Sequence, residues 1–465
     1  MNDYDVLVIG SGPGGYVAAI RAAQLGLKTA VVEKQHLGGI CLNWGCIPTK
    51  ALLKGAEIAH TLTHLDQFGF SVENPQFKVE RLVQHSRDVS AKLTGGIAYL
   101  LNKNGVEVIR GRARVLDKGV VSVLEEETES VFKAAHIILA TGARPRNLPG
   151  VQADGQRIWN YFDALVPKAV PSSLLVIGSG AIGMEFTSLY QDLGSQVTLV
   201  ELNNRIMPVE DAEVAALVHK SFERRGIQIH TQTAVTAVDT QNPQHLVCTL
   251  RQANGQETQV SVDRVLIAAG VQPNIEDLGL EALGVELETG FIKTDAWGQT
   301  NVFGLYAIGD VAGAPCLAHK ASHEGVLCVE KLAGVDSAHA LDYDYIPGCT
   351  YTRPQVASLG LTEEQALARG YQVKVGRFQY QANGKALAMG DSEGFVKTLF
   401  DAATGALLGA HMVGPEVTEQ IQGFGIAHTL EATDEFLQQV VFAHPTLSEA
   451  MHEAILASSG RALHH

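Results

Sequence analysis

Cysteine is scarce in this chain, and the few cysteines are widely spaced. The 465 residues contain six, at positions 41, 46, 248, 316, 328 and 349. Secreted disulfide scaffolds are short and dense in cysteine, so this class of protein is excluded. Residues 1–5 show neither the charged region nor the apolar stretch of a secretory signal peptide. We therefore expect a cytoplasmic location, where a disulfide would be catalytic rather than structural.

Long apolar runs and basic runs are also missing. No stretch approaches the roughly 18 apolar residues that crossing a bilayer requires. The net charge is −15, and the 35 Lys and Arg residues form no long basic run. We therefore expect neither nucleic acid nor a membrane as a partner. Hydrophobic residues make up 46% and charged residues 18% of a chain long enough for about three domains.

Glycine, in contrast, is plentiful, and two clusters of it follow apolar strands. In each case an apolar run leads into glycines, a helical stretch and a second apolar run that ends in an acid. This order occurs over residues 5–33 and again over residues 174–201. In both copies the acid follows the first glycine by 23 residues, from Gly10 to Glu33 and from Gly178 to Glu201. The chain therefore contains a duplicated strand–turn–helix–strand unit.

Each part of this unit suits the binding of a dinucleotide. One glycine makes the tight turn, one lets the backbone approach a pyrophosphate, and one packs the helix on the strand. The helix N-terminus faces the phosphate charge, and the acid accepts hydrogen bonds from ribose hydroxyls while repelling a 2′-phosphate. The predicted residues are Gly10, Gly12, Gly15 and Glu33, then Gly178, Gly180, Gly183 and Glu201. We predict two dinucleotide sites, and Glu201 favours NAD over NADP at the second.

Cys41 and Cys46 lie just behind the first unit. One interpretation is a pair of small buried hydrophobic residues, the commonest fate of intracellular cysteine. The other is a redox pair, but five residues along a regular helix separate two Cα atoms by about 8.6 Å, whereas a disulfide needs less than about 7 Å. A bridge therefore requires a distorted helix, for which Gly45 lowers the cost.

The remaining segments are predicted as follows. A helical region is expected over about residues 52–104, and buried strands are expected near residues 106–109, 120–123, 137–145, 265–273 and 305–310. Asp310 ends the last of these strands, where it either contacts a cofactor hydroxyl or caps a helix. After about residue 344 the pattern predicts an antiparallel sheet that includes residues 373–378 and 395–400, with helices over 418–430 and 448–458.

With these motifs assembled, the chain resembles the pyridine nucleotide–disulfide oxidoreductases over essentially its whole length. The motifs that carry the resemblance are the two glycine units, Gly38–Lys50, Ala140–Pro145, Gly309–Asp310, Leu317–Lys320 and His444–Glu449. The resemblance implies an α/β fold with two Rossmann-like dinucleotide-binding domains, for FAD and NAD, and a C-terminal α+β dimerisation domain.

The resemblance also implies a domain order. The FAD domain is expected over residues 1–150, the NAD domain over 151–275, a segment completing the FAD domain over 276–343, and the interface domain of a homodimer over 344–465. The implied reaction oxidises protein-bound dihydrolipoamide and reduces NAD⁺. The implied partners are lipoyl domains of 2-oxoacid dehydrogenase complexes or the glycine-cleavage carrier protein.

Residue roles follow from the same resemblance. Cys41 meets the substrate, Cys46 meets the flavin and Lys50 lies beside the flavin ring, while His444 and Glu449 reach the disulfide of the partner subunit. Besides the glycines and acids above, Lys50, Ala113, Thr141, Gly142, Asp310, Ala318, Glu185 and Gly270 are expected to contact the cofactors, Glu185 near the nicotinamide. No metal site is expected.

The chemistry of His444 fits a substrate base. The thiolate rather than the thiol is the nucleophile, so a dithiol substrate must lose a proton. Histidine titrates near neutral pH, and Glu449 can orient the ring and stabilise the imidazolium. A lone His–Glu pair is usually a surface ion pair, but Pro445 and the surrounding motif favour the catalytic interpretation.

Several alternatives remain at this point. A glutathione reductase-like enzyme would need basic residues after the second acid, where Arg205 is the nearest cation. A mercuric reductase would need a C-terminal cysteine pair, a soluble transhydrogenase would lack the redox pair, and a non-catalytic sensor would have no use for His444. Trp44 stands where many relatives carry a small aliphatic residue, and it has no assigned role. The tail ending in His464-His465 has no assigned role either, and adventitious metal binding is one option for it.

Overall fold

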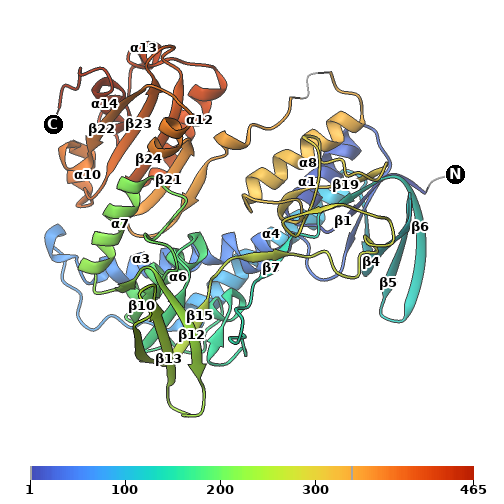
Figure 1. Cartoon of the computed structure of the whole chain (residues 1–465), viewed down its shortest axis with the longest axis horizontal. Helices are drawn as coiled ribbons and strands as arrows, with labels where there is room; N and C mark the ends of the chain where they lie inside the picture. Colours follow the sequence, from blue (N-terminus) through green and yellow to red (C-terminus); the bar gives the residue numbers. More distant parts are fainter. Residues whose placement is uncertain (1–2, 337–338, 465) are drawn as a thin grey trace. The chain divides into compact units, whose positions relative to one another are not determined.

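The computed structural model describes residues 3–336 and 339–464, and the chain splits into two compact units (Figure 1). Unit 1 contains residues 1–52, 80–146 and 270–341. Unit 2 contains residues 53–79, 147–269 and 342–465. Each unit is assembled from three separate stretches, so the chain passes between the units several times.

Unit 1 is built on a seven-stranded sheet. Its strands are β1 (Tyr4–Ile9), β2 (Thr29–Glu33), β3 (Glu107–Arg110), β4 (Arg112–Asp117), β5 (Val120–Glu125), β6 (Thr128–Leu139) and β19 (Leu305–Ala307). The order is β3-β2-β1-β6-β5-β4, and β19 also pairs with β6. The long strand β6 runs antiparallel to β5 in its first half and parallel to β1 in its second half. The predicted return of residues 137–139 to the first sheet is therefore confirmed.

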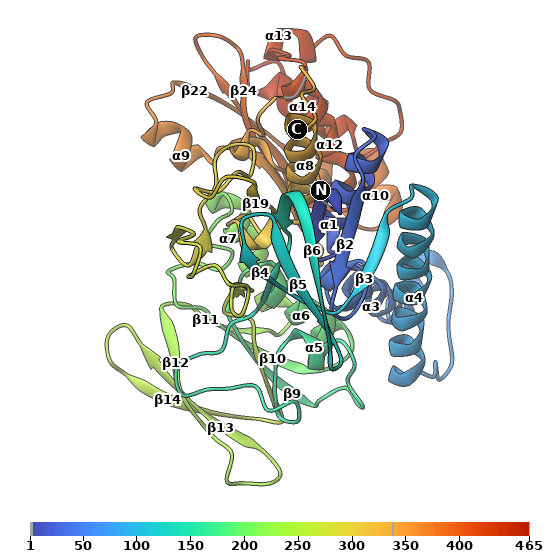
Figure 2. The same cartoon turned by 90° about the vertical axis from the view of Figure 1, so that its right-hand side faces the viewer.

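Helices cover this sheet: α1 (Pro13–Gln24), α2 (Gly39–Trp44), the start of α3 (Cys46–Leu62), α4 (Val79–Lys103) and α8 (Ala318–Leu332), with the short 3₁₀ turn η2 (Gly309–Val311). Both views show α1 beside α8 (Figure 2). Small residues allow this approach, since a Cβ on Gly14 would lie 2.9 Å from the carbonyl oxygen of Ala321. Val6 and Val8 face one hydrophobic cluster and Leu7 and Ile9 face another, as expected of a strand buried on both faces.

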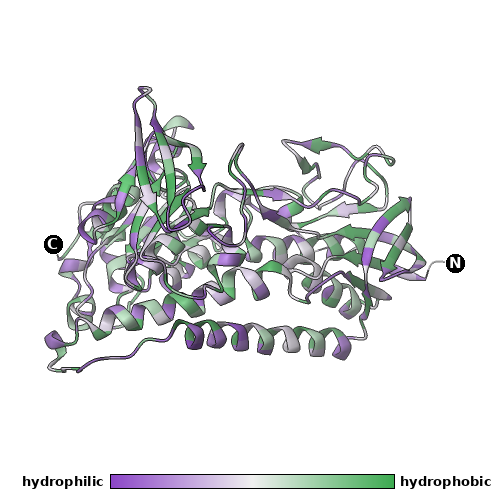
Figure 3. Cartoon of the chain, turned by 90° about the horizontal axis from the view of Figure 1, so that it is seen from below, coloured by the Kyte–Doolittle hydropathy of each residue, from purple (hydrophilic) through white to green (hydrophobic). Residues whose placement is uncertain are grey.

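The single helical region predicted over residues 52–104 is instead two helices. Helix α3 ends at Leu62, α4 begins at Val79, and between them lies only the 3₁₀ turn η1 (Asp66–Phe68). Gly69 has a φ of +78°, which favours glycine, and Pro75 lacks the N–H that a helix needs. Polar and apolar residues alternate along the helices, as Figure 3 shows, so each helix can bury one side.

Unit 2 contains a second parallel sheet. Its strands are β8 (Ile158–Trp159), β9 (Ser173–Ile177), β10 (Gln196–Val200), β11 (Gln228–His230) and β15 (Arg264–Ile267), in the order β11-β10-β9-β15-β8. The helices α5 (Tyr161–Ala164), α6 (Ala181–Asp192) and α7 (Ala212–Arg224) belong to the same part. An antiparallel sheet of β12 (Thr233–Asp239), β13 (Leu246–Gln252) and β14 (Glu257–Val262) follows β11. The predicted strand near residue 265 pairs with β9, as expected.

The C-terminal part of unit 2 is an antiparallel sheet with helices. Its strands β20 (Gly348–Thr350), β21 (Gln355–Gly360), β22 (Val373–Gln379), β23 (Phe395–Asp401) and β24 (Leu407–Gly414) take the order β20-β21-β24-β23-β22. The predicted antiparallel pairing of residues 373–378 with 395–400 is confirmed. The helices are α9 (Glu363–Ala368), α10 (Gly384–Met389), α11 (Val417–Gln420), α12 (Gln422–Thr429), α13 (Asp434–Leu437) and α14 (Glu449–Ala457). The expected α/β fold with an α+β C-terminal part is present.

Two short pairs of strands complete the sheets, β7 (Ala143–Pro145) with β16 (Val271–Pro273) and β17 (Leu287–Glu288) with β18 (Phe291–Ile292). Within the described ranges, no helix has both the length and the apolar character needed to span a bilayer.

Candidate active site

The first glycine turn connects β1 to α1 in the way the sequence predicts. Gly10 has a φ of +99°, and a Cβ on Gly15 would lie 1.9 Å from the carbonyl oxygen of Gly10. A Cβ on Gly12 would meet nothing within 4 Å, and α1 begins there without a side-chain cap. The uncapped N–H groups and the open space beside Gly12 fit an approaching pyrophosphate.

The second glycine turn repeats this geometry between β9 and α6. Gly178 has a φ of +101°, and a Cβ on Gly183 would lie 1.9 Å from the carbonyl oxygen of Gly178. Gly180 has open space around its Cα and begins α6 without a side-chain cap. The duplication read from the sequence is therefore a duplication of backbone geometry, and each copy fits one dinucleotide.

Each acid is held by the serine of its own glycine turn. Glu33 Oε2 accepts hydrogen bonds from the backbone N of Ser11 at 3.0 Å and from its Oγ at 2.6 Å. Glu201 Oε2 accepts the same pair from Ser179, at 2.9 and 2.6 Å. Asn203 donates to Glu201 Oε1 through its backbone N at 2.8 Å and its Nδ2 at 2.6 Å.

These bonds determine the charge of Glu201. Burial alone would raise the pKa of Glu201, but the hydrogen bonds from Ser179 and Asn203 outweigh it and lower the pKa. The carboxylate is therefore ionised at neutral pH and can act only as a hydrogen-bond acceptor. Sequence reasoning missed both serines, although their repetition directly after the first glycine of each turn was the available signal.

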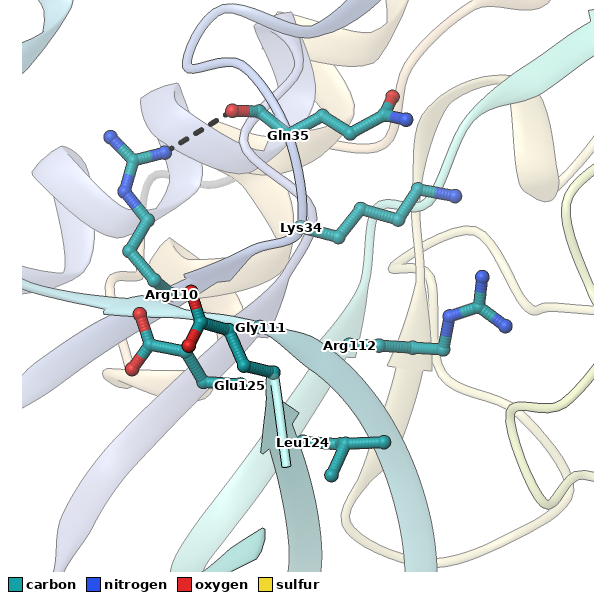
Figure 4. Close-up of a pocket in the computed structure, with 8 residues that line it drawn as sticks. Lys34, Gln35, Arg110, Gly111, Arg112, Leu124 and Glu125 are labelled. Atoms are coloured by element: carbon teal, nitrogen blue, oxygen red, sulfur yellow. Dashed lines mark hydrogen bonds between the residues drawn. The ribbon is translucent and has the colours of Figure 1, made fainter. Parts of the chain in front are cut away.

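A cavity of about 320 Å³ follows Glu33 in unit 1 (Figure 4). It is lined by Lys34, Gln35, Arg110, Gly111, Arg112, Leu124, Glu125 and Glu126. Ala113, expected to contact the cofactor, is the buried residue next to Arg112 on β4. Lys34, which directly follows Glu33, lines this cavity with two further cations and two carboxylates, and these charged groups fit the phosphate and ribose groups of FAD.

The two cysteines lie on two separate helices. Helix α2 ends at Trp44, Gly45 takes φ −142° and ψ −113°, and α3 begins at Cys46. The chain between the cysteines is thus distorted from a regular helix, which is the condition that the spacing of the two cysteines sets for a disulfide. A hydrogen bond joins the side chains of Cys41 and Cys46.

The charge distribution within the cysteine pair is uneven. The hydrogen bond to Cys46 raises the pKa of Cys41, burial raises it further, and Lys50 opposes both. Lys50 follows Cys46 by one helical turn, so it lies on the same side of α3.

Asp310 lies in η2, directly after β19. Burial raises the pKa of Asp310, and the neighbouring Lys320 partly opposes this. Lys320 is 2% exposed and donates through Nζ to the carbonyl oxygens of Gly309 at 3.2 Å and Gly313 at 2.7 Å. Glu324 accepts from the backbone N of Gly309 at 2.7 Å. Two side chains of α8, Lys320 and Glu324, therefore hold the loop that contains Asp310. Ala318 is the first residue of that helix.

Thr141 and Gly142 follow the end of β6. Thr141 Oγ1 donates to the carbonyl oxygen of Asn274 at 2.8 Å, and Asn274 Nδ2 donates back to the carbonyl oxygen of Thr141 at 2.9 Å. Gly142 and Gly270 have φ values of +69° and +95°, which favour glycine. The structure therefore brings Thr141 next to Asn274, a contact that the sequence did not predict.

Glu185 lies in the first part of α6 in unit 2. Its side chain is buried, and Oε1 accepts a hydrogen bond from the backbone N of Tyr351 at 3.1 Å. A buried carboxylate directly after the second glycine turn suits a contact to the nicotinamide end of the dinucleotide.

His444 and Glu449 form the predicted pair. His444 Nδ1 lies 2.9 Å from Glu449 Oε1, and Glu449 Oε2 accepts from the backbone N of Thr446 at 2.8 Å. Burial alone would raise the pKa of Glu449, but Thr446 and His444 lower it. The imidazole is 80% exposed, so its Nε2 is accessible to a substrate.

The C-terminal tail does not form a metal site in the described part of the chain. His464 Nδ1 lies 2.7 Å from Glu453 Oε1 on α14, and the backbone N of Leu463 donates to the same carboxylate at 2.9 Å. His465 lies outside the described residues. Across residues 3–336 and 339–464 there is no group of three or more metal-ligating side chains.

Comparisons with known proteins agree with this geometry. Dihydrolipoyl dehydrogenase of Zymomonas mobilis subsp. mobilis is 54% identical over 464 residues, covering 99% of both chains. The enzyme of that name from Rhizobium etli is 52% identical with 99% coverage of both chains. The crystal structure of LpdA from Mycobacterium tuberculosis superposes with a TM-score of 0.90 at 27% identity, covering 97% of this chain and 98% of that one.

Two family descriptions account for most of the sequence. The dimerisation domain of the pyridine nucleotide-disulphide oxidoreductases matches residues 346–455, which supports a homodimer. The description of the family itself, pyridine nucleotide-disulphide oxidoreductase, matches residues 4–325. This chain therefore belongs to the pyridine nucleotide-disulphide oxidoreductase family.

Proposed function

We propose that this chain oxidises a protein-bound dihydrolipoyl group to the lipoyl disulfide and reduces NAD⁺. As a member of its family it is an oxidoreductase that uses FAD and NAD. The single observation that carries the proposal is the Cys41–Cys46 pair on the two helices behind the first dinucleotide turn, in a chain 54% identical to a dihydrolipoyl dehydrogenase. The carriers we propose are lipoyl domains of 2-oxoacid dehydrogenase complexes or the glycine-cleavage carrier protein.

The domain boundaries belong to the same proposal. We assign FAD binding to residues 1–150 and 276–343, NAD binding to residues 151–275 and the subunit interface to residues 344–465. The contacts of Glu33 with Ser11 and of Glu201 with Ser179 support one dinucleotide site in each half.

The first chemical step is a proton transfer. Nε2 of the partner subunit's His444 takes a proton from one thiol of the substrate, while the partner subunit's Glu449 holds the other ring nitrogen and stabilises the imidazolium. The substrate thiolate then attacks Sγ of Cys41, the Cys41–Cys46 bond breaks, and a mixed disulfide forms.

The second step releases the product. The remaining substrate thiol loses its proton and attacks the substrate's other sulfur in the mixed disulfide, which closes the lipoyl ring and breaks the bond to the sulfur of Cys41. The partner subunit's His444 donates the proton it holds to the departing sulfur of Cys41, and its freed ring nitrogen accepts the proton of the attacking thiol, which then leaves to solvent. Cys46 is left as the thiolate, and Lys50 one turn away stabilises its negative charge.

FAD supplies the transfer of the electron pair from the dithiol to NAD⁺, which leaves as NADH. The chain holds the two cofactors by the glycine turns, Glu33, Asp310 and Thr141 on one side and Glu185 and Glu201 on the other. The overall balance is one dithiol and NAD⁺ converted into one disulfide, NADH and a proton.

The test combines turnover with an anaerobic titration. The purified protein should reduce NAD⁺ with dihydrolipoamide, and NADH should generate the long-wavelength absorbance of a thiolate beside oxidised flavin. Cys46→Ser should abolish both signals, whereas Cys41→Ser should abolish turnover and keep the absorbance. Absence of turnover in the parent protein, or persistence of the absorbance in Cys46→Ser, would contradict the proposal.

A further inference from the structure

Residues 43–45, which are the last two residues of α2 and the Gly45 that follows it, form the link between the two cysteines, and they include Trp44, for which the proposed reaction has no role. Cys41 lies on α2 and Cys46 begins α3. The separation of the two sulfur atoms therefore depends on the conformation of this link. Gly45 is close-packed, since a Cβ there would lie 3.2 Å from the carbonyl oxygen of Ile40 and 3.5 Å from the Cα of Cys41.

Arg87 of α4 contacts this link in two ways. Its Nη1 donates to the carbonyl oxygen of Asn43 at 2.6 Å. Its guanidinium carbon lies 4.6 Å from the centre of the Trp44 ring, within the range of a cation–π contact. The side chain is partly buried where it makes these contacts. Burial lowers the pKa of Arg87, and its Nε is buried without a hydrogen-bond partner.

The side chain of Asn43 extends the same attachment. Its Nδ2 donates to the carbonyl oxygens of Leu37 and Gly39, each at 2.9 Å. Its Oδ1 accepts from Oγ1 of Thr94 at 3.2 Å. Thr94 follows Arg87 by seven residues, so both project from one face of α4. Arg87 and Thr94, on one face of α4, therefore contact the backbone of the link, the amide side chain of Asn43 and the indole ring of Trp44.

We infer that Arg87 is a positioning residue for the cysteine pair and that it acts through Trp44. The inference rests on the proposed role of Cys41 and Cys46 as a redox pair. A disulfide requires a narrow range of Cα separation and torsion. A link held in one conformation keeps the two sulfur atoms at high effective concentration and favours the disulfide over the dithiol. A neutral aliphatic residue at position 87 releases the link and shifts this equilibrium towards the dithiol.

The experiment measures the thiol–disulfide equilibrium of the FAD-loaded protein. Parent protein, Arg87→Met, Arg87→Lys and Arg81→Met are equilibrated anaerobically with dithiothreitol buffers, and free Cys41 and Cys46 thiols are counted by alkylation and mass spectrometry. Arg81 is the matched control because it is an exposed arginine on the same helix. Arg87→Met should shift the equilibrium about tenfold towards the dithiol, about 30 mV for a two-electron couple.

The conservative variant separates charge from shape. Lysine keeps a cation that can reach the Asn43 carbonyl but lacks the planar group that stacks on an indole. Arg87→Lys should therefore lie between Arg87→Met and the parent, and Arg81→Met should match the parent. If Arg87→Met loses FAD or fails to fold, Arg87→Lys carries the test alone.

A double-mutant cycle tests the route through Trp44. In a Trp44→Val background, Arg87→Met should shift the equilibrium at least threefold less than it does in the parent, because the stacking surface is already gone. An Arg87→Met equilibrium equal to that of the parent, or an unreduced shift in the Trp44→Val background, overturns the inference. The thiol equilibrium needs no lipoyl substrate, so a parent protein without lipoamide turnover would contradict the proposed function and leave this result standing.

Discussion

At the scale of single residues, the most consequential feature is a serine that restrains an acid in each dinucleotide unit. Ser179 donates twice to Glu201, and its Oγ also accepts from the backbone N of Met207 at 3.1 Å. The four donors on Glu201 occupy about the full accepting capacity of a carboxylate, so the ribose hydroxyl that we propose to bind there would replace one of them. Ser179 therefore sets both the orientation and the ionisation of Glu201.

Ser179→Ala should weaken NAD⁺ binding while the protein stays folded. A hydrogen bond to a charged group contributes about 1.5–3 kcal/mol. A ribose hydroxyl can partly take the place of the lost serine donor on Glu201. We therefore expect a smaller effect, a five- to tenfold rise in KM for NAD⁺, which corresponds to about 1–1.4 kcal/mol. Loss of this donor also raises the pKa of Glu201. When the pH is lowered, Glu201 should therefore become protonated, and KM for NAD⁺ should begin to rise, at a higher pH than in the parent protein.

The matched control for that variant is Ser11→Ala, which removes the equivalent donor from Glu33. It should weaken retention of FAD and leave KM for NAD⁺ unchanged in the flavin-loaded fraction. Steady-state kinetics from pH 5 to 8 and flavin absorbance after gel filtration provide the two readouts. Equal effects of both variants on KM for NAD⁺ would refute the assignment of one acid to each cofactor.

At the scale of elements, the second glycine turn contains two glycines, Gly180 and Gly183, that are only three residues apart but serve different purposes. One is needed for folding and the other for binding. A Cβ on Gly183 would overlap the carbonyl oxygen of Gly178, at 1.9 Å, so this glycine is required by the fold. A Cβ on Gly180 would meet no atom of the protein within 4 Å, so this glycine is required only by what binds there.

Gly180→Ala should therefore fold normally and lose NAD⁺ affinity, because its methyl group occupies the space that the pyrophosphate needs. We expect an unchanged melting temperature and at least a tenfold higher KM for NAD⁺, about 1.4 kcal/mol. Gly183→Ala should instead lower the melting temperature. Circular dichroism on heating and NADH-forming kinetics measure the two effects. A Gly180→Ala protein with normal KM would contradict the role of this turn in binding.

A second feature at this scale is a buried ionic cluster that joins α7 to the C-terminal sheet within unit 2. Lys397 on β23 is 1% exposed, and its Nζ lies 3.0 Å from Asp211 Oδ2 and 2.7 Å from both Glu213 Oε1 and Glu363 Oε2. Arg377 lowers the pKa of Glu213 to about 2, with Lys397 contributing to the same effect. For Asp211, burial would raise the pKa, but His411 and Lys397 outweigh it and lower the pKa.

Lys397→Met should destabilise the protein by about 3–5 kcal/mol, because it leaves the buried carboxylate of Asp211 without a counter-charge. Lys397→Met combined with Asp211→Asn should recover part of the loss. Denaturation in urea, followed by circular dichroism, compares the two. A double variant no more stable than the single one would show that the charge on Asp211 is not the cause.

The same cluster predicts a direction for acid denaturation. Both carboxylates have lowered pKa values in the folded chain, so their contribution is complete above the unfolded values near 4 and is lost as the pH falls from there towards about 2. Lys397→Met should therefore reduce the difference in stability between pH 6 and pH 3.

At the scale of the whole molecule, the proposed reaction needs two chains. In the proposed active site, Cys41 and Cys46 come from one subunit and His444 comes from the other. The matched dimerisation domain supports a homodimer. Complementation between two inactive variants tests this arrangement. In a heterodimer of Cys46→Ser and His444→Gln chains, one active site contains both intact parts and the other contains neither.

Such heterodimers should have about half of the parent dihydrolipoamide activity, while each variant alone is inactive. Random pairing places half of the chains in heterodimers, so co-expression should give about a quarter of the parent activity. The control is a mixture of the two purified homodimers assayed before any exchange of subunits. Activity no higher than that of this control would show that each active site is built within one chain.

The sequence by itself determined the two glycine turns, their acids and the His444–Glu449 pair. These features depend on local requirements: a glycine with positive φ, a fixed spacing from strand to acid, and two side chains five residues apart beside a helix start. The same local view was wrong about the helical region over 52–104, where Gly69 and Pro75 interrupt the chain. Only the tertiary structure decided which distant groups meet. It placed Arg87 on Trp44 across 43 residues, Lys320 beside the loop of Asp310 and Asp211 against Lys397 across 186 residues, because such contacts follow from packing, for which no periodicity or spacing in the sequence provides a signal.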